Sequence, residues 1–288
     1  MRQDYKTLII YVLTLFVVVL LIVLKKQQDH LADLENEVVE TEEVVISADT
    51  LEQQPEVGVQ KETAQIPMRG VIGLIIDDFG YRNDNISDGF LNLKIPITCA
   101  IIPGHTASKK FAEKAVSYGK EVIIHMPMES ENYSPGEDEY KLLTSMTSEL
   151  LENKLIQAFE SLPEAIGMNN HQGSKATSDS KTMTVLASVL KDRGKYFIDS
   201  RTSSLTIGEK TMISFGVPTA RRNIFLDNNN DLDMIEEQIN KLANSAKKNG
   251  VAVGLGHARK NTLSVLEKVV PGLLDKGFVF QFASQVVK

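Results

Sequence analysis

The feature that most constrains the fold is the alternation of short apolar runs with amphipathic segments from Met68 onward. The apolar runs, such as VIGLII and VAVGLG, have the length and composition of buried strands. Amphipathic segments with helical periodicity lie between several of these runs, over residues 107–118, 148–161, 180–193, 232–249 and 261–276. A glycine follows many of these segments, which is typical of the end of a helix. The alternation predicts parallel strands joined by crossover helices.

The extent of this alternation favours a barrel over a small open sheet. It continues for about 220 residues and includes about seven or eight runs of strand length. We therefore predict an α/β fold of the distorted or incomplete (β/α) barrel type over residues 67–288. In such barrels the functional side chains gather at the carboxyl ends of the strands.

Ionisable residues follow the predicted strands at the points where the strands end. The strand-end residues are Asp77 and Asp78, then His125, His171, Asp199, Arg221 with Arg222, and His257. Three of the five histidines of the chain are in this set. The coincidence predicts a polar site on one rim of the barrel.

The adjacent carboxylates of Asp77 and Asp78 need compensation, because they follow an apolar run that should be buried. A divalent cation held by one carboxylate and two imidazoles would supply it, and this ligand set is common for zinc. The second carboxylate could then act as a general base on water, and a histidine across the rim could protonate the leaving group. The pattern predicts metal-assisted hydrolysis.

Each of these residues also has a purely structural explanation. The two aspartates could cap a helix or form a turn, and each histidine could be a core or loop residue. Asp199 could simply pair with Arg201. His105 precedes a predicted helix and is interpreted as part of its start. The segment from Asp227 resembles the start of a calcium loop but lacks the required glycine and glutamate, so we predict a loop before a helix.

Five segments resemble the motifs of the divergent polysaccharide deacetylase family, which is related to the NodB-like carbohydrate esterases. They read IIDDFGYR, IIHMPMES, GMNNHQGSKATSD, FIDSRTSS and GLGHARKNTL, and the resemblance extends over roughly residues 69–287. It implies a distorted barrel that removes N- or O-acetyl groups from polysaccharides. It also implies that Asp77 is the catalytic base, that Asp78 is a metal ligand and that His257 is the general acid.

The second motif of the resemblance departs from the family pattern. The usual motif places two metal-binding histidines four residues apart, whereas here His125 is followed at that spacing by Glu129. We expect His171 to supply the second imidazole, so that the ligands are Asp78, His125 and His171 and the metal is zinc. The alternative is that Glu129 binds the metal.

Further polar residues match the support of the family's site. The resemblance implies substrate-binding or supporting roles for them, including an arginine that orients the base aspartate. These residues are Glu129, Asn170, Asp199, Arg201 and Arg221.

The N-terminal part of the chain differs in character from the rest. Residues 7–24 contain no charged residue and are long enough to cross a bilayer. No small-residue cleavage site follows, so we predict an uncleaved membrane anchor over residues 1–26. Residues 27–66 contain eleven acidic residues and one basic residue, which predicts a flexible linker. A single membrane-spanning helix would then hold the domain in the periplasm or cell envelope.

Charge and composition limit the candidate partners. Residues 67–288 have no net charge, so no excess of basic residues suggests nucleic acid. The expected partners are an acetylated glycan, the membrane through the N-terminal helix and an envelope protein. We predict a metal-dependent hydrolase that removes acetyl groups from an envelope polysaccharide or other glycan. The alternatives are a non-catalytic envelope protein that binds a glycan or a partner, and a metal-dependent peptidase.

Overall fold

The computed structural model describes residues 67–132 and 135–288. Among the helices in these two ranges, none is both long enough and apolar enough to span a bilayer. The predicted anchor at residues 1–26 and the predicted linker at residues 27–66 lie outside the described residues. Both therefore stay predictions.

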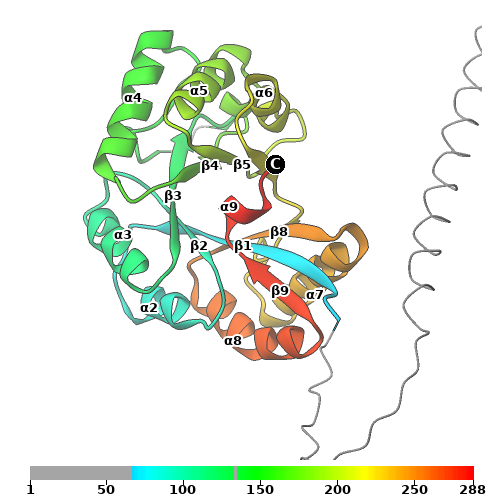
Figure 1. Ribbon diagram of the computed structural model, residues 1–288. Helices are drawn as coiled ribbons and strands as arrows, with labels where there is room; N and C mark the ends of the chain where they lie inside the picture. The colour runs from blue at the N-terminus through cyan, green and yellow to red at the C-terminus, as the bar shows by residue number, and fades with distance from the viewer. Residues whose placement is uncertain (1–66, 133–134) are drawn as a thin grey trace, which may run out of the picture. The chain divides into compact units, whose positions relative to one another are not determined.

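Nine strands of the described chain form one sheet in which all pairs are parallel (Figure 1). They are β1 (Gly70–Phe79), β2 (Thr98–Ile101), β3 (Glu121–Met128), β4 (Gly167–Gln172), β5 (Tyr196–Asp199), β6 (Thr219–Arg221), β7 (Ile224–Phe225), β8 (Val251–His257) and β9 (Phe278–Gln281). Eight of them coincide with the apolar runs of the sequence. The ninth, β7, has two residues and is too short to give a pattern.

The sheet curls without closing. Its strands follow the order β6-β5-β4-β3-β2-β1-β8-β7, and β9 pairs with β1 beside this path. No pairing joins β6 to β7 among the described strands, so the two ends of the sheet stay apart. The prediction of an incomplete parallel α/β barrel is confirmed for this part of the chain.

The helices lie outside the curled sheet, apart from the short C-terminal one (Figure 1). They are α2 (Asn85–Asn92), α3 (Ser108–Ser117), α4 (Ser148–Ser161), α5 (Ser180–Asp192), α6 (Gly208–Phe215), α7 (Leu232–Asn249), α8 (Lys260–Asp275) and α9 (Ala283–Val286), with a 3-10 turn η2 (Ala176–Ser178). The predicted segments coincide with α4 and α7, differ from α5 by one residue at its C-terminal end, and differ from α3 and α8 by one residue at each end. The pattern did not identify α2, α6 and α9, because none of them exceeds eight residues.

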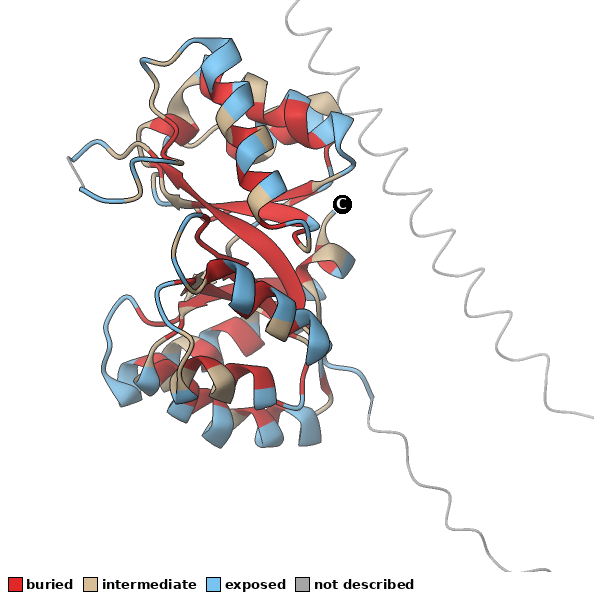
Figure 2. Ribbon diagram, turned by 90° about the vertical axis from the view of Figure 1, so that its left-hand side faces the viewer, coloured by how far each residue is buried: buried red, intermediate tan, exposed pale blue. Residues whose placement is uncertain are grey.

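Two apolar cores pack against the sheet, one on each of its faces. The strands are buried along most of their length (Figure 2). The outer core packs the helices against the strands and includes Phe79 of β1, which stacks on Phe111 of α3 with ring centroids 4.3 Å apart. The inner core lies inside the curl of the sheet and includes Ile75, Ile123 and Leu255. Strands that are buried on both faces explain why the runs are apolar throughout rather than alternating.

The C-terminal segment fills the barrel at the amino ends of the strands. Ala283 and Val286 of α9 belong to the inner core. The first residue of β3, Glu121, accepts hydrogen bonds from Thr98 Oγ1 at 2.8 Å and from the backbone N–H of Ser284 at 3.2 Å. The opposite rim, where the strands end, is therefore the side on which a site can be open.

Candidate metal centre

An extra residue in β1 brings both aspartates to the strand-end rim. Ile76 of β1 is opposite Cys99 of β2, and Phe79 is opposite Ile101, so β1 advances three residues while β2 advances two. Asp78 has a left-handed φ of 66°, which is uncommon for a residue other than glycine. In a regular strand, neighbouring side chains point to opposite faces. The bulge re-aims Asp78 so that both carboxylates lie beside His125.

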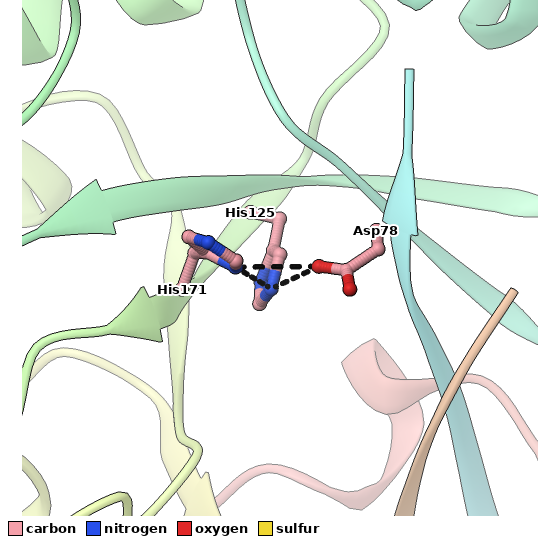
Figure 3. Close-up of side chains that lie close together, drawn as sticks. All are labelled: Asp78, His125 and His171. Carbon is pink, nitrogen blue, oxygen red and sulfur yellow. Dashed lines mark hydrogen bonds and ion pairs between the residues drawn. The ribbon is translucent and has the colours of Figure 1, made fainter. Parts of the chain in front are cut away.

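Asp78, His125 and His171 converge from β1, β3 and β4 (Figure 3). Oδ1 of Asp78 lies 3.3 Å from Nε2 of His125 and 3.2 Å from Nδ1 of His171. The two imidazole nitrogens are 3.0 Å apart. The three expected metal ligands therefore present one atom each to a common point.

These three side chains fit a small divalent cation. A tetrahedral ion with ligands at about 2.0–2.1 Å separates any two of them by about 3.3 Å, close to the distances found here. Oδ1 of Asp78 is also buried without a hydrogen-bond partner among the described residues. A buried oxygen that lacks a donor is costly, and a cation between it and the imidazoles would satisfy it.

The surroundings of Asp78 and His125 already favour a negative carboxylate with a positive charge beside it. Burial opposes ionisation of Asp78, but the adjacent imidazoles of His125 and His171 outweigh burial and hold the pKa of Asp78 well below its ordinary value. Burial likewise opposes protonation of His125, but the charges of Asp77 and Asp78 raise its pKa to about 9. In the metal-free protein, a proton on His125 therefore supplies the positive charge that a bound cation would otherwise supply.

Asp77 is fixed beside this centre by a buried amide. Nδ2 of Asn169 donates to Oδ1 of Asp77 at 2.8 Å, and Oδ1 of Asn169 lies 2.7 Å from Nδ1 of His125. Burial raises the pKa of Asp77 despite the opposing charge of His125. A carboxyl group whose proton affinity is raised in this way is suited to accept a proton.

His257 faces the same point from the end of β8. Its Nδ1 lies 2.8 Å from Oδ1 of Asp227, and its Nε2 lies 3.7 Å from Oδ2 of Asp78. Burial lowers the pKa of His257, but the hydrogen bond and charge of Asp227 outweigh burial and raise it. The imidazole is therefore held with Nε2 toward the centre, and Asp227 favours its protonated form.

Comparison with known proteins identifies the family to which this arrangement belongs. A family model described as divergent polysaccharide deacetylase matches residues 74–287, which include all five residues of the centre. The chain belongs to the divergent polysaccharide deacetylase family. The family and the fold indicate a carbohydrate deacetylase-like protein.

Two relatives are similar to the chain in sequence, and one solved structure is similar to it in fold. An uncharacterized protein of Haemophilus influenzae is 34% identical over 196 residues, which cover 68% of this chain and 69% of that protein. The uncharacterized protein YibQ of Escherichia coli is 33% identical over 206 residues, which cover 72% of this chain and 64% of YibQ. The solved structure of an uncharacterized protein of Agrobacterium tumefaciens is 17% identical with a TM-score of 0.71, over 77% of this chain and 90% of that one, which shows a shared fold.

The glutamate that replaces the family's second histidine lies away from the centre. Oε2 of Glu129 accepts from Thr144 N and Oγ1 at 2.7 Å, and Oε1 pairs with Lys175 at 2.7 Å. The alternative in which Glu129 binds the metal therefore does not fit this structure. Glu129 instead ties the segment after β3 to the segment after β4.

The other predicted supporting residues differ in where they lie. Asp199 is buried and accepts from the backbone N–H of Arg201 at 2.8 Å and from Thr206 Oγ1 at 2.8 Å, so it orders the loop before α6. Asn170 accepts a hydrogen bond from the backbone N–H of Ser200 at 2.8 Å. It also lines a cleft that contains Asp77, His125 and His257. Asp199 does not form a side-chain ion pair with Arg201 within the described residues, contrary to the simple structural explanation.

The arginine after β6 that faces the centre is Arg222 and not Arg221. Arg221 is exposed and pairs with Glu209 at 3.4 Å on the other side of the strand. Arg222 lies in a cleft of about 400 Å³ with Asp77, His125 and His257. The prediction that Arg221 supports the site is therefore wrong. Neighbouring side chains along a strand point to opposite faces, so Arg222 faces the cleft and Arg221 does not. Neither arginine orients Asp77 directly, because Asn169 holds that carboxylate.

Three further residues form a wall behind His171 that sequence reasoning did not assign to the site. Glu137 has a mostly buried carboxylate, with Oε2 3.8 Å from Nε2 of His171 and Oε1 3.9 Å from Nε2 of His105. Tyr81 donates a short hydrogen bond to Glu137 and packs on the ring of His105. The carboxylate of Glu137 places a negative charge beside Nε2 of His171, whereas Nδ1 of the same ring faces Asp78.

Proposed function

We propose that this protein is a metal-dependent hydrolase that removes acetyl groups from an envelope polysaccharide or other glycan. The observation that carries the proposal is the convergence of Asp78, His125 and His171 with Asp77 and His257 at one cleft. Membership in a deacetylase family supports the choice of an acetyl group and a glycan.

Zinc is the proposed ion, with Asp78, His125 and His171 as its ligands. One carboxylate and two imidazoles leave coordination positions open, as in catalytic zinc sites. When bound, the ion supplies Lewis acidity toward the acetyl carbonyl and a lowered pKa for water.

Asp77 is the proposed general base. Its carboxylate lies 3.8 Å from Nδ1 of His125, so it is adjacent to the ligand set without belonging to it. Asp77 accepts the proton of the attacking water, and the raised pKa of this buried carboxyl favours that transfer. The hydrogen bond from Asn169 keeps the second oxygen of Asp77 directed to the cleft.

His257 is the proposed general acid. Nε2 carries the proton that is donated to the departing amine or alkoxide, and Asp227 accepts from Nδ1. The backbone N–H of His257 and the hydroxyl of Thr262 also donate to Asp227, at 2.8 Å and 2.6 Å. A carboxylate held by three donors keeps the imidazole in one orientation through the reaction.

We also propose that residues 7–24 anchor the protein in a membrane and hold the domain on the periplasmic or envelope side. The support for this proposal is the uncharged apolar run with flanking lysines. Alkaline carbonate extraction of membranes tests it. The full chain should stay in the membrane pellet, whereas a chain without residues 7–24 should be released.

The central experiment combines metal content with acetate release by the full chain, purified in detergent and reconstituted with zinc. We expect about one zinc per chain, lost in His125→Ala and in His171→Ala, and acetate release from at least one acetylated oligosaccharide. His105→Ala is the matched control, because its ring lies behind Glu137 and is not a ligand. Asp77→Asn should keep the metal and lose turnover. Metal binding without turnover on any acetylated glycan would instead favour the non-catalytic glycan- or partner-binding protein.

A further inference from the structure

Two guanidinium groups line the cleft beside the candidate reaction centre. Arg201 comes from the loop after β5 and Arg222 from the residue after β6, and both line the cleft with Asp77, His125 and His257. The proposed chemistry uses the carboxylates and imidazoles and gives these two cations no role. We therefore ask which group of a substrate these two guanidinium groups could bind.

Arg222 is held in place by neutral partners. Its Nε donates to the carbonyl of Ser200 at 2.6 Å, its Nη2 donates to the carbonyl of Arg201 at 2.8 Å, and its guanidinium lies 5.0 Å from the ring centroid of Phe225. Burial and the nearby charge of Arg201 lower the pKa of Arg222. Within residues 67–132 and 135–288, no carboxylate lies within ion-pair distance of this guanidinium. The protein therefore fixes a partly desolvated cation without a paired carboxylate, and the charges of Asp199 and Asp77 compensate it only from beyond ion-pair distance.

Arg201 adopts a backbone conformation that an arginine does not favour. Its φ is 49°, in the left-handed region that glycine and asparagine enter most easily. Oδ1 of Asp199 accepts its backbone N–H at 2.8 Å and stabilises this conformation. The guanidinium itself forms no ion pair with a described residue. A strained position occupied by a charged side chain, where a smaller residue would fit better, indicates a use for the charge.

The carboxylates of the cleft are not available to either arginine. Asp77 is bonded to Asn169, and Asp78 is directed to His125 and His171. Asp199 is the remaining nearby acid, and its oxygens are used by the loop before α6. The complementary negative charge must come from the ligand.

We propose that Arg201 and Arg222 bind an anionic group, a carboxylate or a phosphate, on an acetylated sugar. The substrate is then an acidic glycan in which the anion lies close to the acetyl group. Guanidinium groups bind carboxylate and phosphate oxygens through charge-assisted hydrogen bonds. The inference rests on the proposed function for the acetylated sugar and specifies its class.

Binding of small sugars tests this inference without any need for turnover. The probes are N-acetylglucosamine, N-acetylmuramic acid and N-acetylglucosamine 6-phosphate, titrated by calorimetry into the full chain in detergent after removal of metal by a chelator. Removing metal prevents the anion from binding to an ion at the centre. We expect at least one acidic sugar to bind about tenfold or more tightly than the neutral one. The tighter of the two acidic sugars identifies the anion as carboxylate or phosphate.

Two variants assign the effect to the cleft. Arg201→Asn should abolish the preference for acidic sugars and retain the fold, because asparagine tolerates the left-handed conformation. Arg221→Gln is the matched control, since it removes an adjacent charge outside the cleft, and it should keep the preference.

Equal binding of neutral and acidic sugars, no binding of either acidic sugar, or an unchanged preference in Arg201→Asn would each overturn the inference. Acetate release from neutral glycans with no acidic preference would overturn this inference alone, while a preference without turnover would overturn only the hydrolase.

Discussion

Asn169 lies 2.8 Å from Oδ1 of Asp77 and donates its amide proton to that oxygen. The other end of the same amide accepts from Nδ1 of His125. This contact fixes the imidazole with its proton on Nδ1 when neutral, so that Nε2 is free to bind a metal. One buried amide therefore couples the proposed base to the proposed metal site.

Replacing Asn169 with alanine should weaken zinc binding by about 10- to 100-fold, because the orientation of His125 is lost. The free energy of unfolding should also fall by about 1–3 kcal/mol, since Asp77 and His125 lose a buried partner. Competition with a chromophoric chelator measures the affinity, and urea denaturation measures stability. Asn249→Ala, on an exposed helix end, is the control. Unchanged zinc affinity in Asn169→Ala would contradict the coupling.

Zinc binding should be linked to proton release. The pKa of about 9 for His125 means that this imidazole is protonated at neutral pH in the metal-free protein. A metal must displace that proton, so affinity should rise by about tenfold per pH unit from pH 6 to pH 8. Calorimetry in two buffers of different ionisation enthalpy should report about one proton released per zinc at pH 7. Identical heats in both buffers would exclude this linkage.

Replacing Asp227 with asparagine should lower the pKa of His257, because the carboxylate is what raises it against burial. A raised folded-state pKa means that the protonated imidazole stabilises the fold. This contribution is fully present below about pH 6.5, the unfolded value, and is lost as pH rises through the folded pKa. NMR titration of the imidazole in the wild type, in Asp227→Asn and in the exposed control Asp233→Asn measures the shift. If His257 has the same pKa in Asp227→Asn and in the wild type, Asp227 is not the group that raises it.

Replacing Phe79 with alanine should lower the free energy of unfolding by about 3–5 kcal/mol. The ring follows the bulge directly and is 1% exposed between Phe90 and Phe111, with centroid distances of 5.8 Å and 4.3 Å. Urea denaturation followed by circular dichroism measures the loss. Val116→Ala, at an exposed position of α3, should change stability by less than about 0.5 kcal/mol.

Sequence periodicity predicted the elements that carry long, regular patterns. The bounds of α4 and α7, and the positions of eight of the strands, follow from apolar spacing, because each of these elements buries a face. The strand-end positions of Asp78, His125 and His171 could be predicted for the same reason. A parallel sheet brings consecutive strand ends to one rim.

The residues that sequence reasoning missed act through contacts with no local pattern. Asp227 lies thirty positions before His257, and the sequence around it resembles a calcium loop. The two residues form a hydrogen bond only because β7 pairs with β8, which the sequence does not indicate. Arg222 was passed over for Arg221 because a three-residue strand gives too few alternations to assign faces. Glu137 lies in an irregular segment, where neither helical nor strand periodicity applies.

The filled amino end of the barrel limits the directions from which a polymer can approach this site. Glu121, Thr98 and the turn at Ala283 close that end with hydrogen bonds, so the described residues block the barrel axis there. A long chain cannot be threaded through the molecule and must approach from the side. A polymer that reached Asp77 would then lie across the rim, with its ends in solvent. Recognition of such a polymer therefore requires no free terminus, and units far from either end are as accessible as terminal ones.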